Sequence, residues 1–124
     1  MLALARERGV YDELDRAELV SFVSSYQGKY NIIIAGDVLC YFGDLGPFAR
    51  AALGALKPGG RLGFSVEQAH VNEAPEGFVL RPHGRYAHSR ASIERLLPRA
   101  ELTDVVLRYE LAEPVRGWWV SVGA

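Results

Sequence analysis

The sequence lacks several features that mark specialised classes of protein. Its 124 residues contain a single cysteine, Cys40, which excludes an intrachain disulfide and favours a reducing compartment. Only two lysines are present, Lys29 and Lys57, and the 14 basic residues are balanced by 15 acidic ones, giving a formal net charge of −1. Because no run of basic residues is present, the sequence does not support binding of nucleic acid through a basic face.

Long apolar stretches are also missing. No uncharged run approaches the ~20 apolar residues that a membrane-spanning helix needs. The first residues, Met1 to Arg6, have no charged region before their apolar residues and no long apolar core, so they do not resemble a secretion signal. We therefore expect a cytoplasmic protein with no membrane partner, folded as one domain over residues 1–124.

The clearest pattern in the sequence is an apolar strand followed by a helix and a second strand. Residues 32–35 read Ile-Ile-Ile-Ala, a run typical of a central parallel strand that is covered on both faces. Apolar residues at helical spacing follow in 45–56, and Pro-Gly-Gly at 58–60 ends that helix. Residues 61–67 are predicted to be the next strand, so the segment is a βαβ unit.

The rest of the chain indicates further elements around this unit. Residues 2–8 have the composition of the last turns of a helix. The patterns elsewhere predict a helix from 15 or 16 to 26, a polar loop over 68–83, a helix with Ser89 as N-cap that ends near Leu97-Pro98, and a hairpin of strands 102–110 and 115–122.

Four motifs carry a resemblance to a known family. They are Arg8-Gly9-Val10-Tyr11-Asp12, Ala35-Gly36-Asp37-Val38-Leu39-Cys40-Tyr41-Phe42-Gly43-Asp44-Leu45, Leu56-Lys57-Pro58-Gly59-Gly60 and Gly84-Arg85-Tyr86-Ala87-His88-Ser89. With this spacing they resemble class I S-adenosylmethionine-dependent methyltransferases, and most closely the bacterial group of predicted methyltransferases that is often fused to tetratricopeptide repeats. The resemblance covers the C-terminal two-thirds of that fold.

The resemblance implies a fold class and a cofactor. The expected fold is α/β, a truncated Rossmann-like methyltransferase fold with a mixed sheet and a C-terminal antiparallel hairpin, lacking the first strand, helix and strand. The implied cofactor is S-adenosylmethionine, and the residues that match its binding positions in the family are Glu18, Leu19, Ala35, Gly36, Asp37 and Val38. For Glu18, the alternative is an acid that stabilises a helix N-terminus. For Asp37, the alternative is a residue that shapes the turn.

Tyr86 and His88 lie where the family places its acceptor substrate, so the resemblance makes them the candidate catalytic residues. A histidine there is suited to be a general base, because its pKa lies near neutrality. The alternative for His88 is a capping or packing role in a loop. The acceptor implied by the resemblance is a small molecule or a protein.

Other polar residues give weaker indications. Arg81, Arg85 and Arg90 suggest binding of an acidic group through forked hydrogen bonds, or an ordinary solvated surface. His70 and His83 have no partners at the spacing of metal ligands, so no metal site is predicted.

The glycine-rich loop of the family, Gly-x-Gly-x-Gly, is not found anywhere in the 124 residues. We therefore expect weak or no activity from this chain alone. Three interpretations are open: an inactive part of a methyltransferase, a degenerate module that dimerises or binds a protein partner through the exposed edge of strand 32–35, or one half of a split enzyme. A generic α/β domain that binds another nucleotide is the alternative from outside the family.

Overall fold

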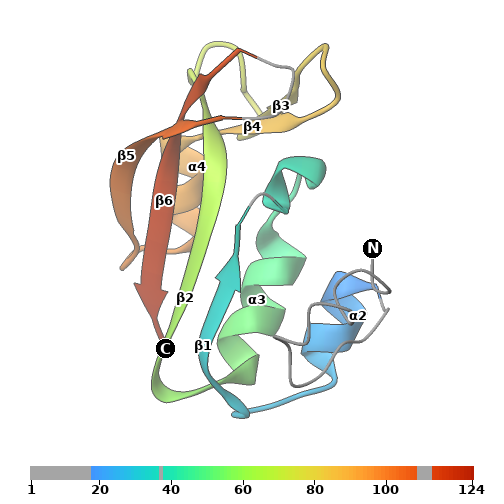
Figure 1. Cartoon of the computed structure of the whole chain (residues 1–124), viewed down its shortest axis with the longest axis vertical. Helices are drawn as coiled ribbons and strands as arrows, with labels where there is room; N and C mark the ends of the chain where they lie inside the picture. The colour runs from blue at the N-terminus through green and yellow to red at the C-terminus, as the bar shows by residue number, and fades with distance from the viewer. Residues whose placement is uncertain (1–17, 37, 109–112) are drawn as a thin grey trace.

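The computed structural model of the chain describes residues 18–36, 38–108 and 113–124. The described elements, shown in Figure 1, are α2 (Leu19–Ser24), β1 (Tyr30–Ala35), the 3-10 helix η1 (Leu39–Tyr41), α3 (Gly46–Ala55), β2 (Leu56–Ala69), β3 (Phe78–Leu80), β4 (Tyr86–Ser89), α4 (Arg90–Leu96), β5 (Glu101–Leu107) and β6 (Val115–Gly123). The predicted helical turns at 2–8, the motif at 8–12 and Asp37 lie outside the described residues.

The long strand β2 is the centre of a mixed sheet whose order is β3-β4-β2-β6-β5, with β1 also paired to β2. One edge of β2 is shared by two parallel partners, since β1 pairs with its first part (Ala35 opposite Phe64) and β4 with its end (Ala87 opposite Glu67). The other edge pairs with antiparallel β6. The predicted βαβ unit and the predicted C-terminal hairpin are both confirmed.

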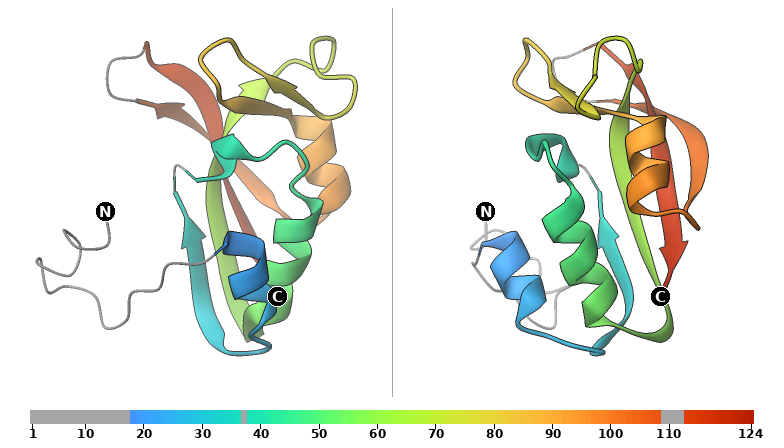
Figure 2. Two further views of the ribbon diagram at one scale, coloured as in Figure 1. Left: turned by 90° about the vertical axis from the view of Figure 1, so that its right-hand side faces the viewer. Right: turned by 180° about the vertical axis from the view of Figure 1, so that it is seen from behind.

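The core lies between this sheet and the helices, and α3 and α4 lie on the same face of the sheet (Figure 2). Alternate residues of β2 point toward them, and Leu62, Phe64 and Val66 are all at most 1% exposed. Helix α3 presents Phe48 and small alanines to the sheet, and the ring of Phe48 meets that of Phe64 edge to face at 6.5 Å. Small residues let the helix approach closely, so the large rings fill the remaining space.

The prediction that residues 32–35 are covered on both faces is wrong. Ile33 and Ala35 face the helices, but the side chains of Ile32 and Ile34 are 66% and 68% exposed. No helix within the described residues packs on that second face. β1 also pairs only with β2 in the described part of the chain, so its outer edge has no partner strand there. The exposed edge expected from the sequence is thus present.

The prediction that residues 68–83 form a loop is wrong in two places. β2 continues to Ala69, and Phe78–Leu80 form β3, which pairs antiparallel with β4. β4 itself contains Tyr86 and His88, which were expected in a loop before a helix. Pairing with β2 and β3 holds this segment in an extended conformation. Such pairing between distant segments overrides the weak conformational preference of the local sequence. Ser89 is the N-cap of α4, as predicted, with its hydroxyl accepting a hydrogen bond from the Ser92 amide at 3.2 Å.

Candidate functional site

The carboxyl end of β1 is the first part of the candidate site. Ala35 is buried against the core, and the chain leaves the sheet at Gly36. A Cβ atom added at Gly36 would have no heavy atom within 4 Å, so the space beside this backbone is open. In open α/β sheets, ligands bind beyond the carboxyl ends of the strands, where small residues let them approach the backbone. Val38, which follows, is half-buried, and Asp37 between them lies outside the described residues.

Glu18 and Leu19 stand at the start of α2, and the predicted helix start at 15 or 16 lies outside the described residues. Glu18 is extended (φ −69°, ψ 131°), and its carboxylate accepts hydrogen bonds from the amides of Val20 at 3.2 Å and Ser21 at 2.7 Å. It is therefore the N-cap, and the helix begins at Leu19. The hydrogen bond from Ser21, followed by that from Val20, lowers the pKa of this exposed carboxyl.

Helix α2 runs in the opposite direction to β1, as Figure 2 shows, because a short connection joins the end of one to the start of the other. The N-terminus of α2 is therefore directed toward the carboxyl end of β1, where the open space at Gly36 lies. The cap accounts for Glu18 structurally, and it leaves the remaining acceptor positions of the carboxylate for a ligand.

His88 links β4 to the segment that follows β1. Its ring is 2% exposed, and Nε2 lies 3.0 Å from the carbonyl oxygens of both Phe42 and Gly43. Those acceptors place the ring proton on Nε2. Nδ1 is buried, with no hydrogen-bond partner among the described residues. Burial lowers the pKa of His88, partly opposed by the two carbonyls.

Tyr86 lies two residues before His88 in β4, so the two side chains are on the same face of the strand, and Tyr86 is only partly buried. Its ring packs on Phe78 at 5.8 Å, and Phe78 in turn lies so close to Gly43 that an added Cβ there would sit 2.8 Å from it. The β3–β4 hairpin is thus held against the segment after β1 through Phe78 and His88. The structure thus places the expected acceptor residues against Phe42 and Gly43, which follow η1 in the chain.

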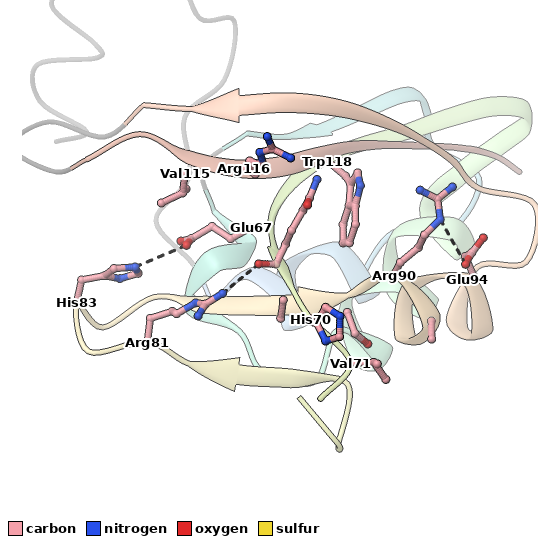
Figure 3. Close-up of a pocket in the computed structure, with 14 residues that line it drawn as sticks. Glu67, His70, Val71, Arg81, His83, Arg90, Glu94, Val115, Arg116 and Trp118 are labelled. Carbon is pink, nitrogen blue, oxygen red and sulfur yellow. Dashed lines mark hydrogen bonds and ion pairs between the residues drawn. The ribbon is translucent and has the colours of Figure 1, made fainter. Parts of the chain in front are cut away.

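A pocket of about 870 Å³ opens where β2 ends, between β4, α4 and the start of β6 (Figure 3). Its charged and aromatic lining includes Glu67, Arg81, His83, Arg90, Glu94, Arg116 and Trp118. Glu67 is 2% exposed; its Oε1 lies 3.6 Å from Nε2 of His83, while Oε2 is buried without a hydrogen-bond partner in the described chain. Sequence analysis assigned no role to Glu67, although an acid at the end of a buried strand was a usable signal.

Two of the arginines suggested as anion binders are already ion-paired. Arg81 makes two contacts with Glu73, at 2.9 and 3.1 Å, and donates to the carbonyl of Gln68 at 3.1 Å. Nε of Arg90 lies 3.5 Å from Glu94 one turn along α4. Figure 3 shows the Arg90–Glu94 pair at the pocket wall, together with the side chain of Arg81. Their charges are largely balanced within the chain, which weakens the expectation of an acidic ligand.

Clustered metal ligands and membrane-spanning helices are both absent from the described residues. Across residues 18–36, 38–108 and 113–124, no three histidine, cysteine or acidic side chains are grouped so as to hold a metal ion. None of the described helices has the length and apolar character required to cross a membrane.

Solved structures with the same fold were found, whereas no protein-family model and no curated protein matches the chain. One is a SAM-dependent methyltransferase from Methanosarcina mazei, with a TM-score of 0.71 and 16% identity over 98% of this chain and 74% of that one. A second, from Clostridium acetobutylicum, has a TM-score of 0.60 and 14% identity over 99% and 70%. A third, magnesium protoporphyrin IX methyltransferase from Synechocystis with bound SAH, has a TM-score of 0.57 and 17% identity over 98% and 57%.

Proposed function

We propose that this chain, which has the Rossmann-like α/β fold of SAM-dependent methyltransferases, is the part of such an enzyme that holds one side of the cofactor and the acceptor. The observation that carries the proposal is the likeness of fold over 98% of the chain. The open space beside Gly36, at the edge of the sheet where this fold places its ligands, supports it.

The residues present fit part of the cofactor. Ala35, Gly36, Asp37 and Val38 would meet its methionine end, while Glu18 and the amide of Leu19 would meet the adenine. Bound S-adenosylmethionine supplies a methyl group on a sulfonium for transfer to a nucleophile. The chain's own contribution is chiefly to position the two reactants, and Tyr86 and His88 are on the acceptor side.

Binding of the cofactor by this chain alone should be weak, with a Kd of roughly 1 mM, because no Gly-x-Gly-x-Gly loop is present to hold the rest of it. The measurement is titration of the ¹⁵N-labelled chain with S-adenosylhomocysteine, followed by amide shifts at Gly36 and Leu19. Leucine at Gly36 should abolish these shifts, since its side chain would fill the open space.

The control for this titration is Gly54→Leu in α3, where an added Cβ also meets no atom within 4 Å. It should leave the shifts unchanged. Glu18→Asn keeps a good N-cap and removes the carboxylate, so a loss of binding in this variant assigns Glu18 to the ligand. Absence of shifts at millimolar ligand, or shifts that survive Gly36→Leu, would contradict the proposed function.

A second candidate function is supported by the exposure of Ile32 and Ile34. An apolar strand whose outer edge has no partner strand among the described residues is a surface for pairing with another chain. The occupant we propose is a second copy, with the two β1 strands antiparallel across a two-fold axis. The chain would then act as a dimeric, non-catalytic module of methyltransferase fold.

The test of this second candidate is the mass in solution, measured by light scattering during gel filtration. The wild-type chain should be a dimer, and Ile34→Lys should be a folded monomer, because the substituted side chain is largely in solvent. Val106→Lys on β5 is the matched control, since Val106 is 57% exposed on another edge strand, and it should remain dimeric. A wild-type monomer rules the homodimer out and leaves a different polypeptide as the partner.

A further inference from the structure

From the pocket at the end of β2, we infer that the chain binds a small ligand through a protonated nitrogen, with the buried carboxylate of Glu67 as its anchor. The inference rests on the proposed function only in identifying this ligand as the methyl acceptor. The binding itself needs no cofactor. The substrate class is therefore an amine, rather than an acid or an alcohol.

The carboxylate of Glu67 is incompletely satisfied in a buried position. The residue is 2% exposed, and its Oε2 has no hydrogen-bond partner in the described chain. Leaving a buried acceptor unpaired is unfavourable, and more so when the group carries charge. The basic side chain nearest to it, that of His83, is 3.6 Å away, which is longer than a hydrogen bond, and lies on an exposed hairpin. A donor from outside the chain would complete this site.

The position of Glu67 is fixed by the sheet around it. Its backbone pairs with Ala87 of β4 on one side and with Gly117 of β6 on the other, so it occupies the last fully flanked position of β2. One residue further on, β6 no longer pairs with β2, whereas β4 remains paired through Ala69 opposite Ser89, and the pocket lies at this end of β2 (Figure 3). An acid held by two neighbouring strands is a rigid anchor, because little conformational freedom is lost when a ligand binds.

The other charges of the pocket favour a cation over an anion. Arg81 is bound to Glu73, and Arg90 to Glu94, so these pairs add little net charge. Arg116 also lines the pocket, but its side chain is exposed, and the field of a solvated charge is screened. Trp118 also lines the pocket, but it is opposite Val66 in the β2–β6 ladder and therefore lies on the other face of the sheet from Glu67. Glu67 is thus the dominant buried charge.

The experiment uses three probes of equal length: butylammonium chloride, sodium butyrate and 1-butanol. Each is titrated into the ¹⁵N-labelled chain, and the amides of Glu67 and His83 and the indole of Trp118 are followed. Butylammonium should shift these signals, and the other two probes should bind at least about tenfold more weakly. Equal shifts with 1-butanol, or none with butylammonium, would overturn the inference.

Variants separate Glu67 from the rest of the pocket. Glu67→Gln keeps the size of the side chain and should weaken butylammonium binding about tenfold, whereas the control Glu94→Gln, an exposed acid of the same pocket, should leave it unchanged. Unchanged affinity in folded Glu67→Gln would overturn the inference. Should this variant not fold, His83→Gln decides instead. It removes the side chain that lies nearest to the carboxylate from an exposed hairpin, so it should strengthen butylammonium binding, and no change would count against Glu67.

The same samples distinguish this inference from the proposed function. S-adenosylhomocysteine is titrated with and without butylammonium. Binding of the amine without binding of the cofactor would support the amine site at Glu67 and would contradict the proposed methyltransferase function. Cofactor binding without amine binding would sustain the methyltransferase proposal and overturn the substrate class.

Discussion

Alanine in place of Gly117 is expected to lower the free energy of unfolding by about 3 kcal/mol. A Cβ at this position would collide with the backbone carbonyl oxygen of Val66 and would lie 2.7 Å from a methyl group of Leu107. The side chain of leucine can turn away, but the carbonyl belongs to the β2–β6 ladder and cannot. Gly117 is also opposite Glu67, so the displacement would open the sheet at the pocket.

Urea unfolding of the two proteins, followed by circular dichroism, measures this difference. The control is Gly54→Ala in α3, where an added Cβ meets nothing within 4 Å. That variant should be more stable than the wild type by up to about 1 kcal/mol, because alanine favours a helix over glycine. A Gly117→Ala chain within about 0.5 kcal/mol of the wild type would show that β6 can shift freely along β2.

Replacement of His88 by alanine is the second large effect, with an expected loss of about 3 kcal/mol. The substitution leaves a cavity where a side chain was 2% exposed, and it removes the donor shared by the carbonyls of Phe42 and Gly43. Because that donor ties β4 to the segment after β1, hydrogen exchange should become faster in both. Faster exchange confined to β4 would contradict this linking role.

The stability of the wild-type chain should also depend on pH through His88. Burial lowers the pKa of His88 in the folded state, so the unfolded chain takes up the proton first as the pH falls. The free energy of unfolding should be level above the ordinary histidine pKa of about 6.5 and fall below it, by at most about 1.4 kcal/mol per pH unit. His88→Asn should lack this dependence, and His83→Gln should keep it.

The elements that the sequence predicted well are those with a strong local pattern. The spacing of Phe48, Ala49 and Ala52 specifies α3, and Ser89 marks the start of α4 by a cap that acts within three residues. Residues 61–67, predicted as the strand after Pro-Gly-Gly, and residues 115–122, predicted as a hairpin strand, lie within β2 and β6. In each case the information lies within one element, so no knowledge of the partner was needed.

The features that sequence analysis missed depend on contacts between distant segments. Phe78–Leu80 is too short to be recognised as a strand, and only its pairing with β4 makes it one. The run of isoleucines indicated burial but not which face a helix covers. Whether His88 is a base or a packing residue depends on two carbonyls more than forty positions away in the chain. The isolation of Glu67 likewise follows from two neighbouring strands.

The sharing of β2 between early and late partners has a consequence for how the chain is made. β1 and α3 come before β2 in the chain. β6, which pairs with the other edge of β2 (Val122 opposite Leu62), comes long after it. During synthesis, one edge of β2 therefore has no partner strand until β6 has left the ribosome, and the apolar residues of β2 are not shielded by β6 until then. Non-local pairing of this kind folds slowly and exposes intermediates to aggregation. A chaperone that holds nascent chains should consequently raise the soluble yield more than lowered temperature alone.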